Sequence, residues 1–273
     1  MGHTPCAPSE EPTLLDNLTV SVITAVRNGV DVVGRTIDSV KEQTFPRIEH
    51  VVVDGASTDG TTEYLASRRS EIQAFQSRPD SGVYDAFNNG LALATGDIVG
   101  FLNAGDVFTD NHSLENIASS FEDPSVDAAF GDVAMTSETD LTKVIRLYRS
   151  NDFRPRFMRY GFMPAHPTVY LRRSIYEALG KYDTSYKIAG DFEYLLRVFL
   201  KRRARFTYIP KALVCMPVGG LSNRGWRSKW QITKEMKTAC MSNQIKTSLL
   251  RLCLRLPIKT YQQVRFRLRQ SDA

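Results

Sequence analysis

Three polar segments of the sequence carry residue types that bind phosphorylated ligands. Asp54–Thr61 (DGASTDGT) combines a carboxylate, two glycines and small hydroxyls. Such a loop can accept hydrogen bonds from the edge of a nucleotide base and donate hydrogen bonds to phosphate or ribose. Ser81–Gly90 places Asp85 and two asparagines at helical spacing, on one helix face. Asn103–Asp106 (NAGD) offers hard oxygen ligands, which suit Mg²⁺ or Mn²⁺ beside a diphosphate.

Each segment also has a purely structural interpretation. Thr58 or Asp59 could cap the helix that follows the first segment, and Asp106 could cap a turn. The polar spacing around Asp85 is also typical of a solvated helix face. The position of each segment relative to the strands therefore decides between the two interpretations.

Apolar, β-branched runs stand before these polar segments. The runs indicate strands, and helical spacing follows them; the expected strands are Val20–Val26, His50–Val53, Ile72–Gln76 and Asp97–Leu102, and the expected helices are Asp31–Gln43, Thr61–Arg69 and Gly82–Ala94. Alternating strands and helices predict a largely parallel sheet. Because ligands bind beyond the carboxyl ends of such strands, we expect the loops to converge on one crevice.

The pattern changes after about residue 125. Short strand-like pieces at Asp127–Phe130 and Lys143–Arg149 precede an aromatic stretch, and a helix is expected at Phe192–Lys201 with a strand at Arg205–Ile209. This second half is interpreted as the part that handles an acceptor.

Composition excludes several classes of protein. With 42% hydrophobic residues, the chain can bury a sizeable core. Its four cysteines form no CxxC pair, so neither a zinc site nor a disulfide framework is expected, and a reducing, cytoplasmic compartment is favoured. No apolar run approaches the roughly 20 residues of a membrane-spanning helix. The polar amino terminus has no apolar stretch typical of a secretory signal.

The basic charge is concentrated at the carboxyl end. From Arg224 onward the net charge is +10, against −5 for the residues before it. An apolar stripe with Arg251 and Arg255 opposite predicts an amphipathic basic helix that ends at Pro257; the stripe consists of Ile245, Leu249, Leu252, Cys253 and Leu256. The stripe could lie on an anionic membrane or pack on the catalytic domain or a second subunit, which leaves a homodimer open. No nucleic-acid partner is expected, because aromatic stacking motifs are missing.

Together, these motifs resemble the family-2 glycosyltransferases. The matching segments are Val22–Asn28, Asp54–Thr61, Asp80–Asn88 and Leu102–Asp106. Their order and spacing match over roughly the first 110 residues, and a looser match continues to about Ser222. The resemblance is strongest to the subgroup that assembles bacterial exopolysaccharide, colanic-acid-like, capsule or O-antigen chains.

The resemblance implies an α/β structure with the GT-A fold, which is a Rossmann-like, predominantly parallel mixed sheet flanked by helices. Residues 1–17 are expected to form a flexible leader and residues 18–222 the catalytic domain. Within that domain, residues 18–110 would bind the nucleotide-sugar and residues 111–222 the acceptor. Residues 223–273 would form the basic helical extension.

The family pattern also implies roles for single residues. The residues implied to bind the nucleotide-sugar are Thr24, Ala25, Arg27, Asp54, Asp80, Asp85 and Asn103. Asp106 would be the metal-binding acid that ends the family's Asp-x-Asp motif, although Asn103 and Gly105 stand where many members carry aspartates. His166 is a second candidate metal ligand, and Asp191 falls where inverting members keep the catalytic base.

These roles imply an inverting glycosyltransferase that uses Mn²⁺ or Mg²⁺. It would move one sugar from a UDP- or GDP-sugar donor to a glycan or lipid-linked acceptor, in the cytoplasm or at the inner face of the cell membrane. A carboxylate can take the acceptor's proton while a cation neutralises the leaving diphosphate. Two alternatives remain open, namely a non-catalytic nucleotide-sugar-binding module and a sugar nucleotidyltransferase.

Overall fold

The computed structural model describes residues 14–218 and 225–255. Its strands are β1 (Val20–Val26), β2 (Ile48–Asp54), β3 (Ala74–Ser77), β4 (Ile98–Phe101), β5 (Val107–Phe108), β6 (Ala128–Thr136), β7 (Val144–Tyr148), β8 (Tyr170–Arg172) and β9 (Phe206–Pro217). Its α-helices are α1 (Val30–Lys41), α2 (Thr61–Ser67), α3 (Val83–Leu93), α4 (Ser113–Ser119), α5 (Arg173–Leu179), α6 (Gly190–Leu196), α7 (Gly225–Ser242) and α8 (Leu249–Cys253). A π-helical turn, Arg197–Lys201, continues α6.

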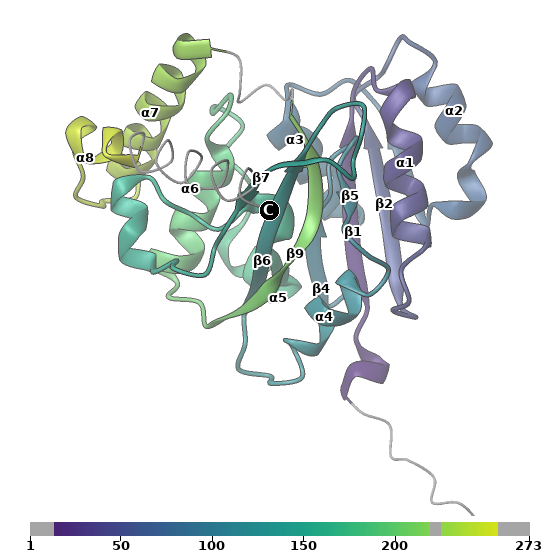
Figure 1. Ribbon diagram of the computed structural model, residues 1–273, viewed down its shortest axis with the longest axis horizontal. Helices are drawn as coiled ribbons and strands as arrows, with labels where there is room; N and C mark the ends of the chain where they lie inside the picture. The colour runs from purple at the N-terminus through teal and green to yellow at the C-terminus, as the bar shows by residue number, and fades with distance from the viewer. Residues whose placement is uncertain (1–13, 219–224, 256–273) are drawn as a thin grey trace, which may run out of the picture.

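All nine strands belong to one mixed sheet. The order is β3-β2-β1-β4-β8-β6-β9-β5, and β7 pairs with β6 (Figure 1). The first four strands of this order run parallel, which confirms the parallel sheet predicted for the first half. β8 is antiparallel to both β4 and β6, so it joins the parallel part to the second half.

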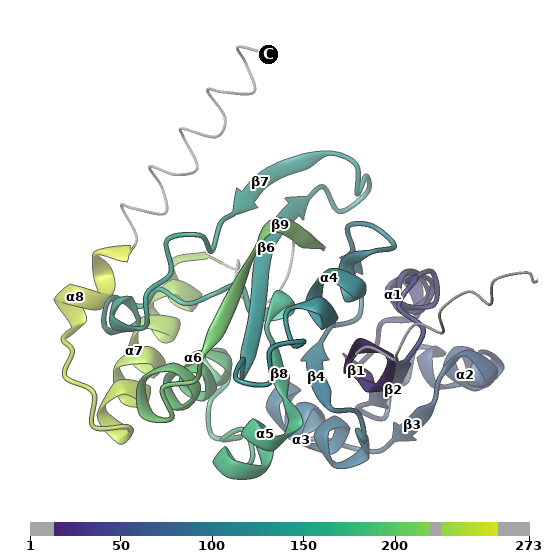
Figure 2. The same ribbon diagram turned by 90° about the horizontal axis from the view of Figure 1, so that it is seen from below.

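Apolar side chains explain why these elements form. β1 is buried along nearly its whole length, as expected for a central strand covered on both faces. On α1, Val33, Ile37 and Val40 recur at helical spacing and are buried against the sheet. Helices α1 and α2 lie beside the β1–β3 region, while α6, α7 and α8 gather at the opposite end of the molecule (Figure 1 and Figure 2).

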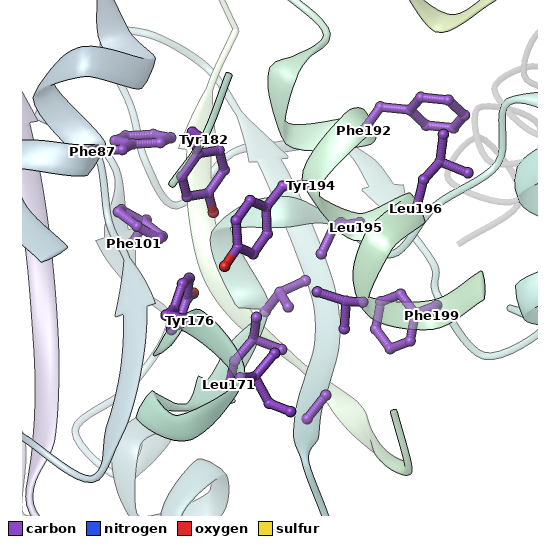
Figure 3. Close-up of a cluster of buried hydrophobic side chains, with 14 of the residues drawn as sticks. Phe87, Phe101, Leu171, Tyr176, Tyr182, Phe192, Tyr194, Leu195, Leu196 and Phe199 are labelled. Atoms are coloured by element: carbon purple, nitrogen blue, oxygen red, sulfur yellow. The ribbon is translucent and has the colours of Figure 1, made fainter. Parts of the chain in front are cut away.

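One aromatic cluster joins the two halves of the chain. Figure 3 shows Phe87 and Phe101, from α3 and β4, facing tyrosines of the second half. The Tyr182 ring stacks on Tyr194 at 4.1 Å and meets the Phe101 ring edge-on at 5.6 Å. Aromatic pairs at these separations add to the stability given by burial. Residues from both halves of the chain therefore pack into one of its buried apolar clusters.

The carboxyl-terminal helix differs from the one predicted. α8 is only Leu249–Cys253, and Ile245 lies before it. Leu252 is fully buried and Ile245 packs beside it in the main core, so these two stripe residues pack on the protein. Arg255, expected to face water, is buried, and its guanidinium donates to Thr233 Oγ1 at 3.0 Å.

The placement of Arg255 thus corrects the predicted helix. The Met236 sulfur and the Thr233 hydroxyl, both on α7, accept hydrogen bonds from the Arg255 guanidinium. These bonds compensate for the burial of the guanidinium. Leu256, the last predicted stripe residue, lies outside the described residues, as do residues 1–13 of the expected leader. In the described part of the chain, no helix is both long and apolar enough to cross a membrane.

Candidate active site

Two of the predicted loops are tied together at the carboxyl ends of β1 and β2. Asn28 follows β1 with a positive φ of 51°, and its backbone N–H donates to Ser57 Oγ at 2.7 Å. In return, the N–H of Thr58 donates to Asn28 Oδ1 at 2.9 Å. Arg27, beside this junction, is exposed. Both loops thus lie at one edge of the sheet, as parallel topology requires.

Asp54 organises its own loop. Its buried carboxylate accepts from the hydroxyls of Ser57, Thr62 and Ser77, with oxygen to oxygen distances of 2.8 Å for Thr62 and 2.5 Å for Ser77. Burial opposes ionisation, but these donors together hold the pKa of Asp54 below its usual value. A contact from Asp54 to a nucleotide base stays a prediction, and any such contact would share the carboxylate with these hydroxyls.

The side chains of Asp80 and Arg27 both lie close to the backbone of Gly55. A Cβ at Gly55 would collide with the Asp80 carboxylate and lie 3.2 Å from Arg27 Cδ. The Asp80 Oδ1 also accepts from the Gly82 N–H at 3.0 Å, just before α3 begins. A glycine at position 55 therefore lets an acid and a cation, from separate loops, approach the same backbone.

The start of α3 lies against the start of α6. A Cβ at Gly190 would lie 2.7 Å from the Tyr84 ring, and the Tyr84 hydroxyl donates to the Ile188 carbonyl at 2.5 Å. Burial raises the pKa of Tyr84, and the nearby charge of Asp191 raises it further. Asp85 follows Tyr84 in α3, and Asp191 follows Gly190 in α6. The first turns of the two helices, which bear the two predicted acids, therefore pack together, while the Asp85 carboxylate itself accepts from the N–H and hydroxyl of Ser81 at 3.0 and 3.1 Å.

Asp191 stands in the first turn of α6 rather than before it. The N-cap is Ala189, and Asp191 Oδ1 accepts from the N–H of Phe192 at 2.7 Å. An acid just before the helix expected at Phe192–Lys201 could instead serve as its N-cap. The observed helix begins two residues earlier, so Asp191 lies within the helix and Ala189 occupies the cap position.

Two residues of α1 hold the Asn103–Asp106 loop. The Thr36 hydroxyl accepts from the Gly105 N–H and donates to the Asp106 carbonyl, both at 2.9 Å. Arg35 lies beside the same loop, with Nη2 3.1 Å from where a Cβ on Gly105 would stand. Gly105 has a φ of 97°, which glycine adopts without strain.

Thr36 and Arg35 were not predicted from the sequence. The available signal was Thr36 itself, a polar residue on the otherwise apolar buried face of α1. Such a residue needs a partner inside the protein, because burial of an unpaired hydroxyl is unfavourable. Nothing in the sequence pattern identifies that partner, which comes from a loop about 70 residues later.

The Asn103–Asp106 loop has the oxygen atoms that a divalent cation requires. Asn103 Oδ1 is buried and has no hydrogen-bond partner among the residues that the structure describes. Asp106 is 7% exposed, and burial raises its pKa to about 7 although Arg35 opposes this shift. Bound cation charge would favour the ionised carboxylate. These two residues therefore fit a cation that takes its remaining ligands from phosphate and water, as Mg²⁺ does.

His166 lies inside the aromatic cluster. Its ring stacks on Phe87 and on Phe101, each with a centroid distance of 5.6 Å, and its Nε2 is 3.4 Å from the Tyr182 hydroxyl. Burial lowers the pKa of His166 to about 4, so the imidazole is neutral at pH 7. Among the described residues, no group of three or more His, Cys, Asp or Glu side chains could hold a metal. The role of His166 as a metal ligand stays a prediction.

Thr24 differs from its predicted environment. Its side chain is fully buried in β1, with Oγ1 3.0 Å from Nε2 of His50. The backbone of Thr24 rather than its buried side chain would then face a nucleotide, and its role in the donor site stays a prediction. Ala25 and Arg27 are less buried and lie closer to the strand end. The loop after β4 passes beside them, because the Ala104 N–H donates to the Ala25 carbonyl at 3.3 Å.

The sequence of the chain matches a known family. The profile of "Glycosyl transferase family 2" matches residues 21–180. An uncharacterised glycosyltransferase of Mycobacterium tuberculosis is 33% identical over 205 residues, which cover 73% of this chain and 71% of that protein. A PGL/p-HBAD biosynthesis glycosyltransferase of Mycobacterium bovis is 30% identical over 216 residues, covering 74% and 78% of the two chains.

Solved structures share the fold. A mannosyltransferase of Pyrobaculum calidifontis, solved with GDP-Man and Mn²⁺, superposes with a TM-score of 0.61 at 21% identity, covering 94% of this chain and 73% of that one. TarS 1–349 of S. aureus with UDP-GlcNAc gives a TM-score of 0.61 at 18% identity, covering 82% and 67%. Against the same fragment with UDP, the chain spans 66% of its length. The chain therefore belongs to glycosyl transferase family 2 and has the GT-A fold.

Proposed function

We propose that this glycosyltransferase moves one sugar, with inversion, from a UDP- or GDP-sugar to a glycan or lipid-linked acceptor of the bacterial cell surface. The observation that carries the proposal is the junction of α3 and α6. The close packing of Gly190 on the Tyr84 ring holds the first turn of α6, which bears Asp191, against the first turn of α3, which bears Asp85, and this supports the proposal. A base on the acceptor side, facing the donor loops, is the arrangement that single displacement requires.

The donor site is assigned to the loops after β1, β2 and β4. Arg27, Asp80 and Asp85 would border the ribose and diphosphate, and Ala25 the nucleotide. Structures of similar fold have been solved with UDP-GlcNAc and with GDP-Man, which supports a nucleotide-sugar as the ligand of these loops. Discrimination between sugars depends on a few contacts.

A divalent cation, Mn²⁺ or Mg²⁺, would be held by Asp106 with Asn103. When bound, it would neutralise charge on the leaving diphosphate. Two residues of α1 would support the loop that holds this cation. Thr36 holds the loop at two backbone atoms, and Arg35 supplies a further positive charge beside Gly105.

Part of the proposal is that α7 and α8 touch an anionic membrane surface where lipid-linked acceptors reside. Of the large apolar side chains exposed in the described residues, all but Val83 lie on or beside these helices, namely Trp230, Met241, Leu250 and Leu254. Exposed cations, including Lys234 and Arg251, lie among them. Apolar and basic side chains on one surface are typical of peripheral membrane contact.

The test of the donor is a thermal-shift panel of UDP-, GDP- and dTDP-sugars with and without Mn²⁺. A ligand that binds only the native state raises the unfolding temperature. A shift with one nucleotide-sugar, larger with the metal, is expected. The anomeric configuration of the transferred sugar, read by NMR, then tests inversion. Retention, or no shift with any nucleotide-sugar, would contradict the proposal.

A further inference from the structure

A cavity lies outside the donor loops, between β6, the end of β7 and β9. It has a volume of about 350 Å³, and its polar lining consists of Asp132, Arg149, Asn151, Tyr208 and Lys211. We call it the β6–β9 cavity. Its β9 residues follow the part of the chain that the family profile matches, residues 21–180. The cavity is therefore built partly from sequence outside the matched region.

A bulge in β9 creates this cavity. Phe130 pairs with Tyr208 and Asp132 pairs with Ala212, so three residues of β9 stand opposite Gly131 alone. A Cβ at Gly131 would lie 2.8 Å from the Lys211 carbonyl oxygen, so the close approach of β9 favours glycine here. Bulges redirect side chains out of the regular pleat and are frequent beside binding sites.

Within the described residues, only one of the two carboxylate oxygens of Asp132 accepts hydrogen bonds. Asp132 is 6% exposed, and its Oδ1 accepts from the Ser150 N–H at 2.8 Å and from the Tyr208 hydroxyl at 3.1 Å. Its Oδ2 accepts no hydrogen bond from residues 14–218 or 225–255. Because the protein does not enclose this oxygen, a ligand hydroxyl in the cavity can reach it and donate a hydrogen bond.

Two cations lie at the rim, and one of them, Arg149, is close enough to Asp132 for its charge to favour the ionised carboxylate. Arg149 and Lys211 are exposed, and neither forms an ion pair with a carboxylate within the described residues. The Lys211 ammonium donates to the uncharged amide oxygen of Asn116 at 3.1 Å, so its charge remains uncompensated. Guanidinium and ammonium groups bind carboxylates through charge-assisted hydrogen bonds. The rim therefore favours a negatively charged group.

We propose that the β6–β9 cavity binds an acidic sugar residue, with its carboxylate at Arg149 and Lys211 and a ring hydroxyl donating to Asp132 Oδ2. The apolar faces of Leu147 and Pro210 complete the lining and suit the C–H face of a sugar ring. Asn151 can accept from or donate to a second hydroxyl. That this sugar belongs to the acceptor rests on the proposed function, whereas the binding itself does not.

The probe is methyl β-D-glucuronide, titrated into the full chain without donor and followed by NMR. Methyl β-D-glucoside and inorganic phosphate are the matched neutral and non-sugar ligands. We expect the glucuronide to bind at least about tenfold more tightly than either, since both the acid and the hydroxyl contribute. Equal binding of phosphate would overturn the proposal, because it would reduce the cavity to an anion-binding patch.

Substitutions of the lining residues test whether the glucuronide binds in the β6–β9 cavity. Arg149→Gln and Lys211→Gln, both at exposed positions, should each weaken glucuronide binding about tenfold. Lys181→Gln, an equal charge change at an exposed position outside the cavity, should leave it unchanged. Asp132→Asn should also weaken binding, and a melting curve would show whether the variant is folded. Unchanged binding in both cation variants would overturn the proposal.

A competition experiment with UDP distinguishes failure of this inference from failure of the proposed function. Saturating UDP should leave glucuronide binding unchanged, because the donor loops lie elsewhere. Competition by UDP would overturn the cavity as a separate site. Failure of all nucleotide-sugars to bind, with glucuronide binding intact and sensitive to Arg149→Gln, would remove the proposed function and keep the cavity.

Discussion

Thr36 holds Asp106 through its backbone, because one hydroxyl on α1 both accepts from the Gly105 N–H and donates to the Asp106 carbonyl. The Asn103–Asp106 loop is therefore attached to α1, in addition to the hydrogen bond within the loop from the Asp106 N–H to the Asn103 carbonyl at 3.0 Å. The Asp106 side chain remains available for a ligand while its main chain is held.

Thr36→Val should loosen this loop. Valine keeps the shape but removes both hydrogen bonds, at a cost of about 1–3 kcal/mol in the free energy of unfolding. We expect weaker Mn²⁺-dependent donor binding, measured by calorimetry. Thr36→Ser keeps the hydroxyl and should retain most of the affinity. Equal behaviour of the two variants would contradict a role for the hydroxyl.

Asp191→Asn should abolish transfer and leave donor binding nearly intact. The amide has the same shape but cannot take the acceptor's proton, and loss of a general base typically lowers kcat by about 10²–10⁴-fold. Donor affinity and initial rates of transfer, measured on the same preparation, check this. Normal turnover by the variant would remove Asp191 as the base.

Asp106→Ala should weaken the binding of nucleotide-sugar only when metal is present. The carboxylate is the one acid of the loop, so its removal leaves Asn103 as the sole oxygen ligand from a side chain there. The check is a comparison of donor affinities with Mn²⁺ and with EDTA. A variant that keeps the full metal effect would show that the cation binds elsewhere.

Stability should fall on acidification because His50 is buried in its neutral form. Burial lowers its pKa from 6.5 to about 4, so between these values the unfolded chain binds the proton and the folded chain does not. This contribution is present above pH 6.5 and lost as the pH falls toward 4. Between pH 7 and pH 5 it amounts to about 2 kcal/mol.

His50→Gln should remove this part of the pH dependence, which urea unfolding at the two pH values would measure. Glutamine has no proton to gain in this range but can still reach Thr24. If wild type and variant lose stability equally between pH 7 and pH 5, His50 is not responsible.

Replacing Leu250 and Leu254 by Asp should weaken binding to anionic liposomes. These side chains are 75% and 46% exposed, so their removal costs little folding energy, whereas it removes apolar surface that would enter the bilayer. We expect at least about tenfold weaker sedimentation with vesicles at low salt. Replacing Ala66 and Ser70 by Asp, at exposed positions outside α7 and α8, adds the same two charges without removing apolar surface of these helices and is the control. No binding by the wild type would remove the membrane contact.

The sequence predicted the donor half well because its elements are local. β1 was predicted at its observed bounds, and α1 within two residues at each end, from apolar spacing alone. The second half depends on contacts between distant residues. β9 was expected at Arg205–Ile209 but continues to Pro217, because β6 and β5 pair with its later residues.

The site was predicted as a set of residues but not as a set of contacts. The hydroxyl partners of Asp54 and the burial of Thr24 depend on neighbouring strands, which periodicity cannot report. Arg255 was expected in water because a charged residue opposite an apolar stripe is usually solvated. Its burial depends on Thr233 and Met236 of α7, which no local pattern reveals.

The pairing of β5 with β9 has a consequence for biosynthesis. Val107 and Phe108 follow Asp106 directly, and their partners are Cys215 and Val214, more than 100 residues later. A nascent chain can form the β1–β4 units early, but the strand that follows the Asn103–Asp106 loop has no partner until residue 215 leaves the ribosome. The loop itself can be held early by Thr36 of α1, whereas the strand that follows it is completed only by the second half of the chain.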